Sequence, residues 1–255
     1  MSTTLIKVCA LGMTGAMAVG LVACGGKSSS SDTPATTATQ SSALATASAT
    51  PTESTRTTNL KRLSKDDFTK AVSGTKINNQ TFTVVDSSQL GAQVEQVVQA
   101  MNQAKFSPEQ CGQIIKQTTA SVTGNEINNI VSAASTDQPS PSAINFNIAM
   151  SDRQKKTYEN ESEQFSKCGH ATMTLQGHKT TMTMKVTPIK GYEDIAKQAS
   201  LYTTISSADN GPEMSSSQAY VWLKNDQMVQ ASAQDAATAQ STLKAAVDAL
   251  GIDAK

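Results

Sequence analysis

The chain has 255 residues, of which 38% are hydrophobic and 16% are charged, and its 21 basic residues balance its 21 acidic ones. Lys7 is the only charged residue among the first 23, so the rest of the chain carries 20 basic and 21 acidic residues, a net charge of −1. Nucleic-acid binding needs a cationic surface that displaces counterions from phosphates, so this composition argues against a nucleic-acid partner. Aromatic residues make up only 4% of the chain, so the core must rely on Ala, Val, Ile and ten Met.

The N-terminal residues have the build of a secretory signal peptide. Lys7 precedes an apolar stretch over residues 8–23, and these roughly 16 residues are fewer than the about 20 that a membrane-spanning helix needs. The stretch ends in the sequence LVACG at residues 21–25, which resembles the lipobox of bacterial lipoproteins, whose cysteine receives diacylglycerol before cleavage frees its amine. We therefore expect a lipoprotein signal peptide over residues 1–23 and lipidation of Cys24.

A flexible stalk is expected over residues 24–59. Gly, Ser, Thr, Ala and Pro supply 28 of the 35 residues from 25 to 59, so this segment cannot form a core. A coil of that length spans about 30 to 35 Å, at roughly 5 to 6 Å times the square root of the residue number. The two or three acyl chains of a lipoprotein anchor it durably, because each buried methylene contributes about 0.8 kcal/mol. The expected location is the extracytoplasmic face of the cell membrane, with the membrane as a partner through the lipid at Cys24.

The remaining cysteines predict one disulfide bond. Cys9 would leave with the signal peptide and Cys24 would be acylated, so Cys111 and Cys168 remain as an isolated pair in an oxidising compartment. Closing so long a loop stabilises a fold by about 4 kcal/mol in the chain-entropy model. The pair lacks the close CxxC spacing that redox-active and metal-binding cysteines generally use.

An ordered domain is expected over residues 60–255, and it begins with a short helix. Ser64 and Asp67 form a capping box, with Leu63 and Phe68 spaced as a hydrophobic staple. Residues 81–85 are rich in β-forming residues. The next apolar positions recur at the spacing of one helix face, which predicts a second helix through Leu90, Val94, Val97, Val98 and Met101.

Two further helices and a strand are predicted in the middle of the domain. Ser107 is the expected N-cap of the third helix, with Pro108 at its first position. The expected buried side of this helix holds Cys111, Ile114, Ile115 and Thr118. Alternation predicts a strand through Ile144, Phe146 and Ile148. Residues 152–168 are expected to form a charged helix, whose inner stripe is Tyr158, Phe165 and Cys168.

Two hairpins are predicted next, and each turn sets a register. If Gly177-His178 is a two-residue turn, Met173 faces Met182, Leu175 faces Thr180 and Ala171 faces Met184. If Asn225-Asp226 is the second turn, Trp222 meets Val229 and Tyr220 meets Ala231 on one face, with Leu223 and Met228 on the other.

A closing helix completes the predicted fold. Asp235 is its expected cap, Gly251 ends it, and its apolar stripe holds Ala239, Leu243, Ala246, Val247 and Leu250. Helices with single apolar stripes and strands that mostly alternate favour an α+β fold. We expect a single domain in which an antiparallel sheet has helices packed on one face.

A family resemblance follows from the last third of the chain. The sequence PIKGYEDIA at residues 188–196, followed by strands, the hairpin of residues 220–231 and an Ala-rich helix, resembles the extracellular sensor domain of PknH-type actinobacterial kinases and related secreted lipoproteins. By element order the resemblance covers residues 60–255. It implies a sheet and helices bordering a cleft for an unidentified ligand. Those sensor domains contain two disulfides, whereas this chain can make one.

No complete catalytic constellation is present in the sequence, so we expect neither enzymatic activity nor a cofactor. The leading hypothesis is a lipid-anchored, sensor-like envelope protein that binds a small-molecule, lipid or protein ligand. One alternative is a carrier for an envelope lipid or glycolipid, which needs an apolar cavity. Another is a surface copper-binding lipoprotein, whose soft ligands would be drawn from Met173, Met182, Met184, His170 and His178. An open polar cleft would favour sensing or partner contact.

Overall fold

The computed structural model describes residues 60–73, 75–85, 87–135, 141–209 and 211–252. The predicted signal peptide, Cys24 and the rest of the stalk lie outside the described residues. The helices are α1 (Lys65–Val72), α2 (Ser87–Gln103), α3 (Glu109–Ala120), the 3-10 helix η1 (Gly124–Asn129), α4 (Asp152–Ser166) and α5 (Ala236–Ala249). Of the helices in the described ranges, none combines the length and the apolar composition that crossing a membrane requires.

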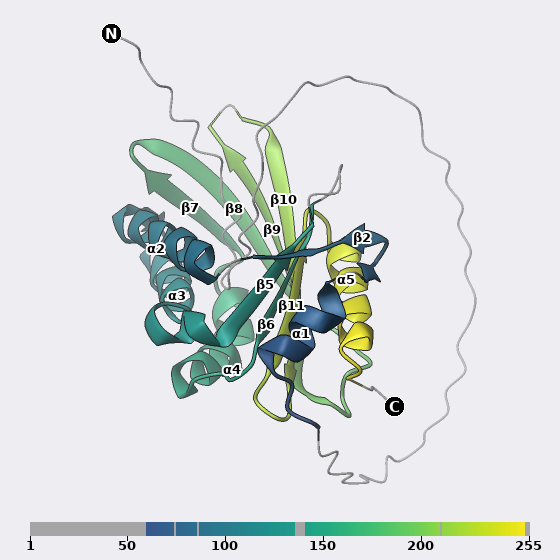
Figure 1. Ribbon diagram of the computed structural model, residues 1–255. Helices are drawn as coiled ribbons and strands as arrows, with labels where there is room; N and C mark the ends of the chain where they lie inside the picture. The colour runs from purple at the N-terminus through teal and green to yellow at the C-terminus, as the bar shows by residue number, and fades with distance from the viewer. Residues whose placement is uncertain (1–59, 74, 86, 136–140, 210, 253–255) are drawn as a thin grey trace, which may run out of the picture. The chain divides into compact units, whose positions relative to one another are not determined.

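The strands form a small hairpin and one large antiparallel sheet. The hairpin pairs β1 (Lys76–Ile77) with β2 (Gln80–Thr81). The sheet has nine strands in the order β3-β5-β6-β11-β10-β9-β8-β7-β4 (Figure 1). Their bounds are β3 (Thr83–Val85), β4 (Lys105–Ser107), β5 (Ile130–Ala134), β6 (Ala143–Asn147), β7 (His170–Leu175), β8 (His178–Pro188), β9 (Ala196–Ala208), β10 (Glu213–Leu223) and β11 (Met228–Ala233).

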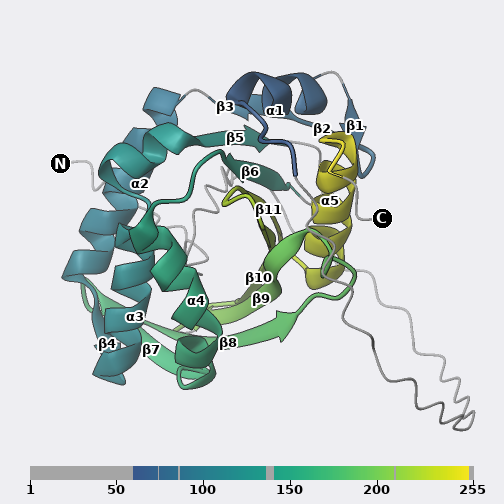
Figure 2. The same cartoon turned by 90° about the horizontal axis from the view of Figure 1, so that it is seen from below.

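Helices cover both faces of this sheet. The sheet is curved, with α2, α3 and α4 inside the curve and α1 and α5 outside it (Figure 2). We call these two sides the inner face and the outer face. The α+β class and the antiparallel sheet are confirmed, but the prediction that helices lie on one face is wrong. Consecutive residues of a strand point to opposite faces, and all six residues of β11 are buried, so both faces of this strand are covered.

Two main hydrophobic clusters follow from this layering. The outer cluster joins the sheet to α1 and α5, and in it Phe68 stacks on Phe146 with ring centroids 5.5 Å apart. The inner cluster joins the other face to α2, α3 and α4. Leu90 and Val94 of α2 are instead buried in a third, small cluster with Val122 and Ile130. The apolar residues of α2 therefore pack into two different clusters.

Local signals place most helix ends correctly. The capping box of α1 is confirmed, since Ser64 Oγ accepts from the Asp67 amide at 3.1 Å and the Asp67 carboxylate accepts from the Ser64 amide at 2.8 Å. Asp235 caps α5 as predicted. The predicted N-cap of α3 is wrong, because Ser107 belongs to β4 and pairs with Thr172, which leaves Pro108 at the cap position.

Both predicted hairpin registers are wrong, for different reasons. In the first, the turn is Gln176-Gly177, both with positive φ, so Met173 faces Thr180 and Ala171 faces Met182. This shift of two residues leaves every side chain on its predicted face.

In the second hairpin the turn contains one more residue than predicted. The Leu223 amide donates to the Gln227 carbonyl, and Asp226 has a φ of 63°. Val221 therefore faces Val229, and Trp222 faces Met228. This one-residue shift places Val229 on the outer face, away from Tyr220 and Trp222 on the inner one.

Candidate functional site

Buried polar side chains line the inner face of the central strands. One row crosses five neighbouring strands from β9 to β5 and holds Ser200, Tyr220, Gln230, Asn145 and Ser132. Each of these five side chains belongs to a residue that is at most 5% exposed. Ser132 Oγ donates to Asn145 Oδ1 at 2.6 Å. A sheet face that is covered by helices ordinarily carries apolar residues, so a buried polar row of this length is unusual.

The flanking rows are also rich in hydrogen-bonding groups. On one side lie Tyr202, Gln218 and Ser232, and on the other Gln198, Trp222, Met228 and Asn147. No inner-face position in these three rows carries an acidic or basic residue. The surface is therefore polar and uncharged.

Helix α4 covers part of this polar surface. Its capping box forms between Ser151 and Gln154, and the Gln154 side chain also accepts from Asn147 Nδ2 at 3.2 Å. The next inward positions of the helix are Tyr158, Glu161 and Phe165, all at most 1% exposed. The spacing of one helix face thus directs a phenol and a carboxyl at the inner face.

Three tyrosines pack together between α4 and the sheet. Tyr202 and Tyr220 stack with ring centroids 5.6 Å apart, and Tyr158 meets Tyr220 edge-on at 5.2 Å. Gln198 Nε2 donates to the Tyr220 hydroxyl at 2.6 Å. Burial raises the pKa of all three phenols, and the neighbouring Glu161 carboxyl raises it further. All three are therefore neutral at physiological pH.

Glu161 enters this aromatic cluster from α4. Among the described residues it is the only acidic or basic residue that is buried, at 1% exposed. Burial raises the pKa of Glu161 to about 8, and the Tyr202 hydroxyl opposes the rise. Neither carboxyl oxygen makes a hydrogen bond within the described part of the chain, so the contact with Tyr202 falls short of hydrogen-bond geometry.

Three more buried side chains on this side of the sheet have polar atoms without a hydrogen-bond partner among the described residues. These atoms are the Tyr158 hydroxyl, Thr204 Oγ1 and Trp222 Nε1, and their residues are at most 3% exposed. A buried polar group without a partner costs roughly 1 to 3 kcal/mol. Such groups are expected where a ligand or an ordered water supplies the missing partners.

A small cavity adjoins the cluster. It lies between α4 and strands β6 and β11, and has a volume of about 10 Å³, close to the space of one water molecule. Its lining is Val122, Ile130, Asn145, Asn147, Gln154, Tyr158, Met228 and Gln230. The polar members of this lining could hold one ordered water there.

The opposite side of α4 borders an open groove, which we call the amide groove. It lies between α3 and α4 and has a volume of about 380 Å³. Its lining is Gln110, Gln113, Ile114 and Gln117 from α3, and Asn160, Glu163, Gln164 and Lys167 from α4. Glu163 and Lys167 form an ion pair at 2.8 Å, which lowers the pKa of the Glu163 carboxyl. The groove is therefore polar, open and without net charge.

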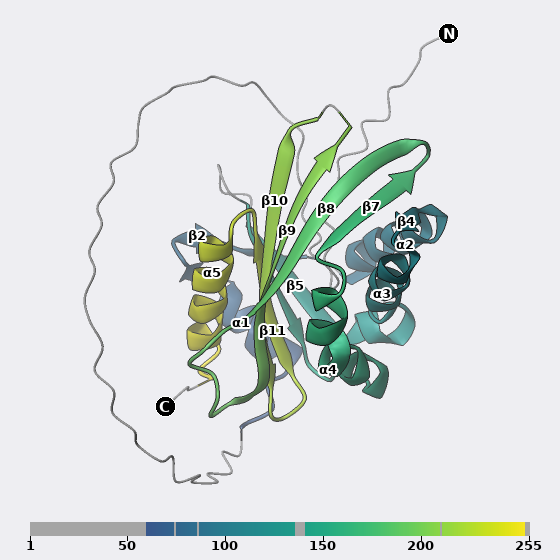
Figure 3. The same cartoon turned by 180° about the vertical axis from the view of Figure 1, so that it is seen from behind.

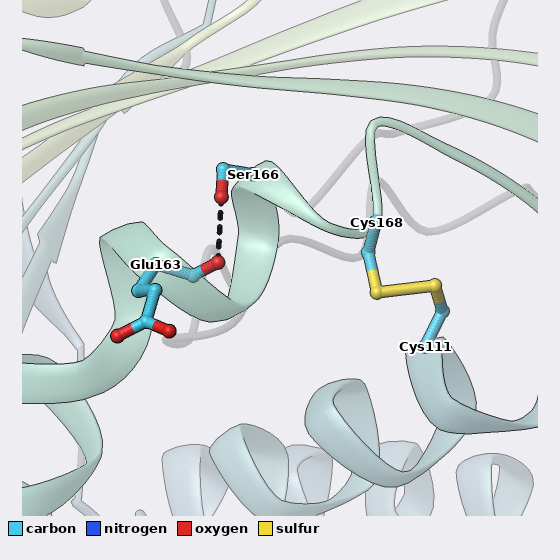
Figure 4. The surroundings of a disulfide bond; sticks show 4 residues. All are labelled: Cys111, Glu163, Ser166 and Cys168. Atoms are coloured by element: carbon cyan, nitrogen blue, oxygen red, sulfur yellow. Dashed lines mark hydrogen bonds between the residues drawn. A yellow bond between two sulfur atoms is a disulfide. The ribbon is translucent and has the colours of Figure 1, made fainter.

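The predicted disulfide is confirmed and joins these two helices. It links Cys111 in the first turn of α3 to Cys168, two residues beyond the end of α4, with Cα atoms 5.5 Å apart (Figure 4). Ser166 Oγ donates to the Glu163 carbonyl in the last turn of α4. The start of α3 is thus tied to the end of α4 beside the amide groove.

The residues considered for copper are divided between two places. Met173, Met182 and Met184 are buried in the inner cluster. His170 is exposed beside Thr183, and His178 is exposed next to the Gln176-Gly177 turn. In the described ranges, no three His, Cys, Asp or Glu side chains gather into a group that could hold a metal ion.

Sequence reasoning missed the polar rows and Glu161. Asn145 and Asn147 alternate with Ile144 and Phe146, and Gln218 and Tyr220 alternate with Ala219 and Val221. In a sheet with one covered face, this alternation is typical of solvent-facing polar residues. One feature of the sequence could have identified Glu161 as buried. It lies three residues after Tyr158 and four before Phe165, which is the spacing of the buried face of that helix.

Comparisons with known proteins reveal little similarity. A scan against protein-family models found no match, and a search of curated proteins found none. A search of solved structures found an X-ray structure of an uncharacterized protein from Mycobacterium smegmatis, an Rv0999 ortholog. It is 13% identical over 67% of this chain and 86% of that one, with a TM-score of 0.34.

Proposed function

We propose that this chain is a lipid-anchored extracytoplasmic protein that binds a polar ligand on the inner face of its sheet, without catalysis. The observation that carries the proposal is the set of four buried side chains, Tyr158, Glu161, Thr204 and Trp222, whose polar atoms lack hydrogen-bond partners among the described residues. A ligand that supplied those partners would recover the cost of burying them.

The ligand is expected to lie along β9 and β10. Because β9 and β10 are antiparallel, Thr204 lies on one side of the Tyr202–Tyr220 pair, opposite Ser216, and Trp222 lies on the other side, opposite Gln198. Strands β8, β9 and β10 extend well past α4 (Figure 3). The ligand would run from the part of the inner face beyond α4 to the cluster beneath that helix.

The chemistry of the lining supports a hydrogen-bonding ligand over an acyl chain. Trp222 Nε1 can only donate, whereas the hydroxyls of Thr204 and Tyr158 can donate or accept. A lipid carrier would instead need a cavity walled by apolar side chains. The three rows at the centre of the inner face hold more polar than apolar side chains. Sensing or capture of a polar ligand therefore accounts for them better than lipid transport.

The envelope location is supported by the sequence and by the disulfide. The LVACG sequence at residues 21–25 provides the acylation site, and the Ser/Thr/Ala-rich stretch provides the stalk. A structural disulfide such as Cys111–Cys168 persists in an oxidising compartment and is rare in the cytosol. These observations together favour a protein held outside the cytoplasmic membrane.

The amide groove favours a second activity, which is contact with a partner protein. Five of its eight lining residues are Gln or Asn, whose side chains both donate and accept hydrogen bonds. Helix α4 contributes to the groove on one side and to the ligand cluster on the other. A ligand that shifted α4 would therefore change the surface that a partner meets.

Native mass spectrometry of the mature protein, purified from its own envelope, tests the proposed function. We expect a co-purifying polar small molecule, and we expect Thr204→Val to reduce the fraction of protein that carries it. Thr203→Val is the matched control, since Thr203 is the neighbouring residue on the outer side of the same strand. Retained lipid mass, or equal occupancy in the two variants, would contradict the proposal.

A further inference from the structure

We infer that the ligand of the inner-face site carries one organic ammonium group and that Glu161 receives it. This inference rests on the proposed function, because it names the class of ligand for the same site. It has its own observations, which are the lone buried carboxyl, the aromatic rings around it and the absence of charge from the central inner-face rows.

The first observation is a carboxyl without a counter-charge. The titratable groups that act on Glu161 or are acted on by it are three neutral phenols, Tyr158 of α4, Tyr202 of β9 and Tyr220 of β10. Lys155 and Lys197, near the start of α4, are both engaged with Asp226. An ionised carboxyl in such surroundings is costly unless a cation pairs with it. A ligand ammonium would supply that missing charge.

The second observation is the aromatic surroundings of the carboxyl. The rings of Tyr202 and Tyr220 stack on neighbouring strands, Tyr158 meets Tyr220 edge-on, and Phe165 meets Tyr202 edge-on at 5.7 Å. Ring faces attract ammonium groups, and aromatic cages with a nearby acid bind quaternary ammonium ligands. The same protein already uses this attraction at the edge of the cluster, where Lys197 Nζ lies 5.1 Å from the centre of the Trp222 ring.

The third observation limits the ligand to a single charge. Every inner-face position in the three rows that cross β9, β10 and β11 is uncharged, and the Lys197 ammonium over Trp222 at their edge is already paired with Asp226. These rows therefore offer hydrogen bonds but no free second ionic partner. Trp222 Nε1 can donate to a ligand oxygen, and the Thr204 hydroxyl can donate or accept. The ligand class is therefore a monocation with hydroxyl or carbonyl groups, and not a polyanion or a hydrocarbon.

Choline and its uncharged analogue 3,3-dimethylbutan-1-ol form a matched pair of probes for this site. The full chain contains one tryptophan, Trp222, which lies in the cluster and serves as an intrinsic fluorescence reporter. Titration of the full chain in detergent is expected to change the Trp222 emission saturably with choline and not with the analogue. Glu161→Gln is expected to weaken choline binding about 10- to 100-fold, the range for a lost charge-assisted interaction.

Glu163→Gln is the control on the same helix. Glu163 is exposed in the amide groove, so this variant should bind choline as the parent chain does. The pH dependence provides a readout that a structural role would not move. Since a cation binds the ionised carboxyl, choline affinity should rise about tenfold per pH unit up to about pH 8 and then level off. Glu161→Gln should show no such rise.

Three outcomes would overturn the inference. They are equal binding of choline and its analogue, unchanged choline affinity in Glu161→Gln, and no saturable choline signal in the millimolar range. None of them contradicts the proposed function by itself, because a neutral polar ligand could still co-purify and depend on Thr204. Loss of both the choline signal and any co-purifying ligand would instead contradict both proposals.

Discussion

Tyr202 and Tyr220 stack across neighbouring strands with their hydroxyl oxygens 3.4 Å apart. They are diagonal neighbours, since Tyr202 lies opposite Gln218 and Tyr220 lies opposite Ser200. The stack brings two phenols together beneath α4, where Glu161 is buried. These polar groups therefore lie next to the inner hydrophobic cluster. Substitutions among them should change the melting temperature and the ligand affinity in different ways.

Glu161→Gln should stabilise the protein at neutral pH. The pKa of this carboxyl is about 8 in the folded chain, against an ordinary value of 4.5. Between those values the folded state holds a proton that the unfolded state has lost, so stability is highest below pH 4.5 and falls as the pH rises to about 8. The neutral amide removes this loss, and we expect a melting temperature roughly 5 °C higher at pH 7.

Melting curves at pH 5, 7 and 9 measure this effect. The difference between Glu161→Gln and the parent chain should grow from pH 5 to pH 9. Glu163→Gln is the comparison, because its ion pair with Lys167 is exposed and screened by solvent, so its loss should change the stability little. A parent chain whose melting temperature does not fall relative to Glu161→Gln over this range would show that Glu161 is not buried as described.

Gly112→Ala and Gly91→Ala should have opposite effects although both lie within helices. A Cβ atom at Gly112 in α3 would lie 2.7 Å from Phe106, which packs β4 against this helix, so the substitution should destabilise the protein by about 1 to 3 kcal/mol. A Cβ atom at Gly91 in α2 meets nothing within 4 Å, so it should stabilise by up to about 1 kcal/mol. Urea unfolding of both variants checks the signs, and equal effects would argue against this packing.

Removing the disulfide should lower the melting temperature by several degrees. Cys111 and Cys168 are 57 residues apart, and a cross-link of that span stabilises a fold by about 4 kcal/mol in the chain-entropy model, with 2 to 4 typical. The double substitution Cys111→Ser and Cys168→Ser should melt earlier than the oxidised parent chain. Adding a reductant should lower the parent's melting temperature and leave the variant's unchanged. If the reductant has no effect on the parent, the two cysteines are not joined.

Cys24→Ala should release the protein from the membrane fraction. The expected diacylglycerol is attached to that thiol, and without it the remaining anchor would be an uncleaved signal peptide. Fractionation followed by intact-mass measurement distinguishes the two states. The parent protein should begin at Cys24 and carry acyl mass. A Cys24→Ala variant that stays embedded would identify residues 8–23 as an anchor.

Helix ends and helix faces could be predicted from the sequence because their causes are local. The capping box at Ser64 and Asp67 and the cap at Asp235 involve residues three positions apart. The buried residues of α5 recur at one-turn spacing, as the predicted stripe required. The pairing of Cys111 with Cys168 followed from elimination and compartment, which also needed no tertiary information.

Strand registers and the covering of the sheet could not be predicted in this way. Each hairpin register depends on which turn residues adopt a positive φ, and here Gln176 and Asp226 do so although neither is glycine. The N-cap of α3 failed because Ser107 pairs with Thr172 in a neighbouring strand, which lies 65 positions away. The helix and strand propensities of neighbouring residues contain no information about a pairing partner so far away in the sequence.

The sequence by itself determined where most helices begin, which residues share a helix face, and which cysteines could join. Only the tertiary structure decided that the polar residues alternating along β6, β10 and β11 lie beneath helices, and that Glu161 enters a cluster of tyrosines. The physical reason is that burial depends on what covers a residue. The elements that cover Glu161, β9 and β10, begin 30 or more residues further along the chain.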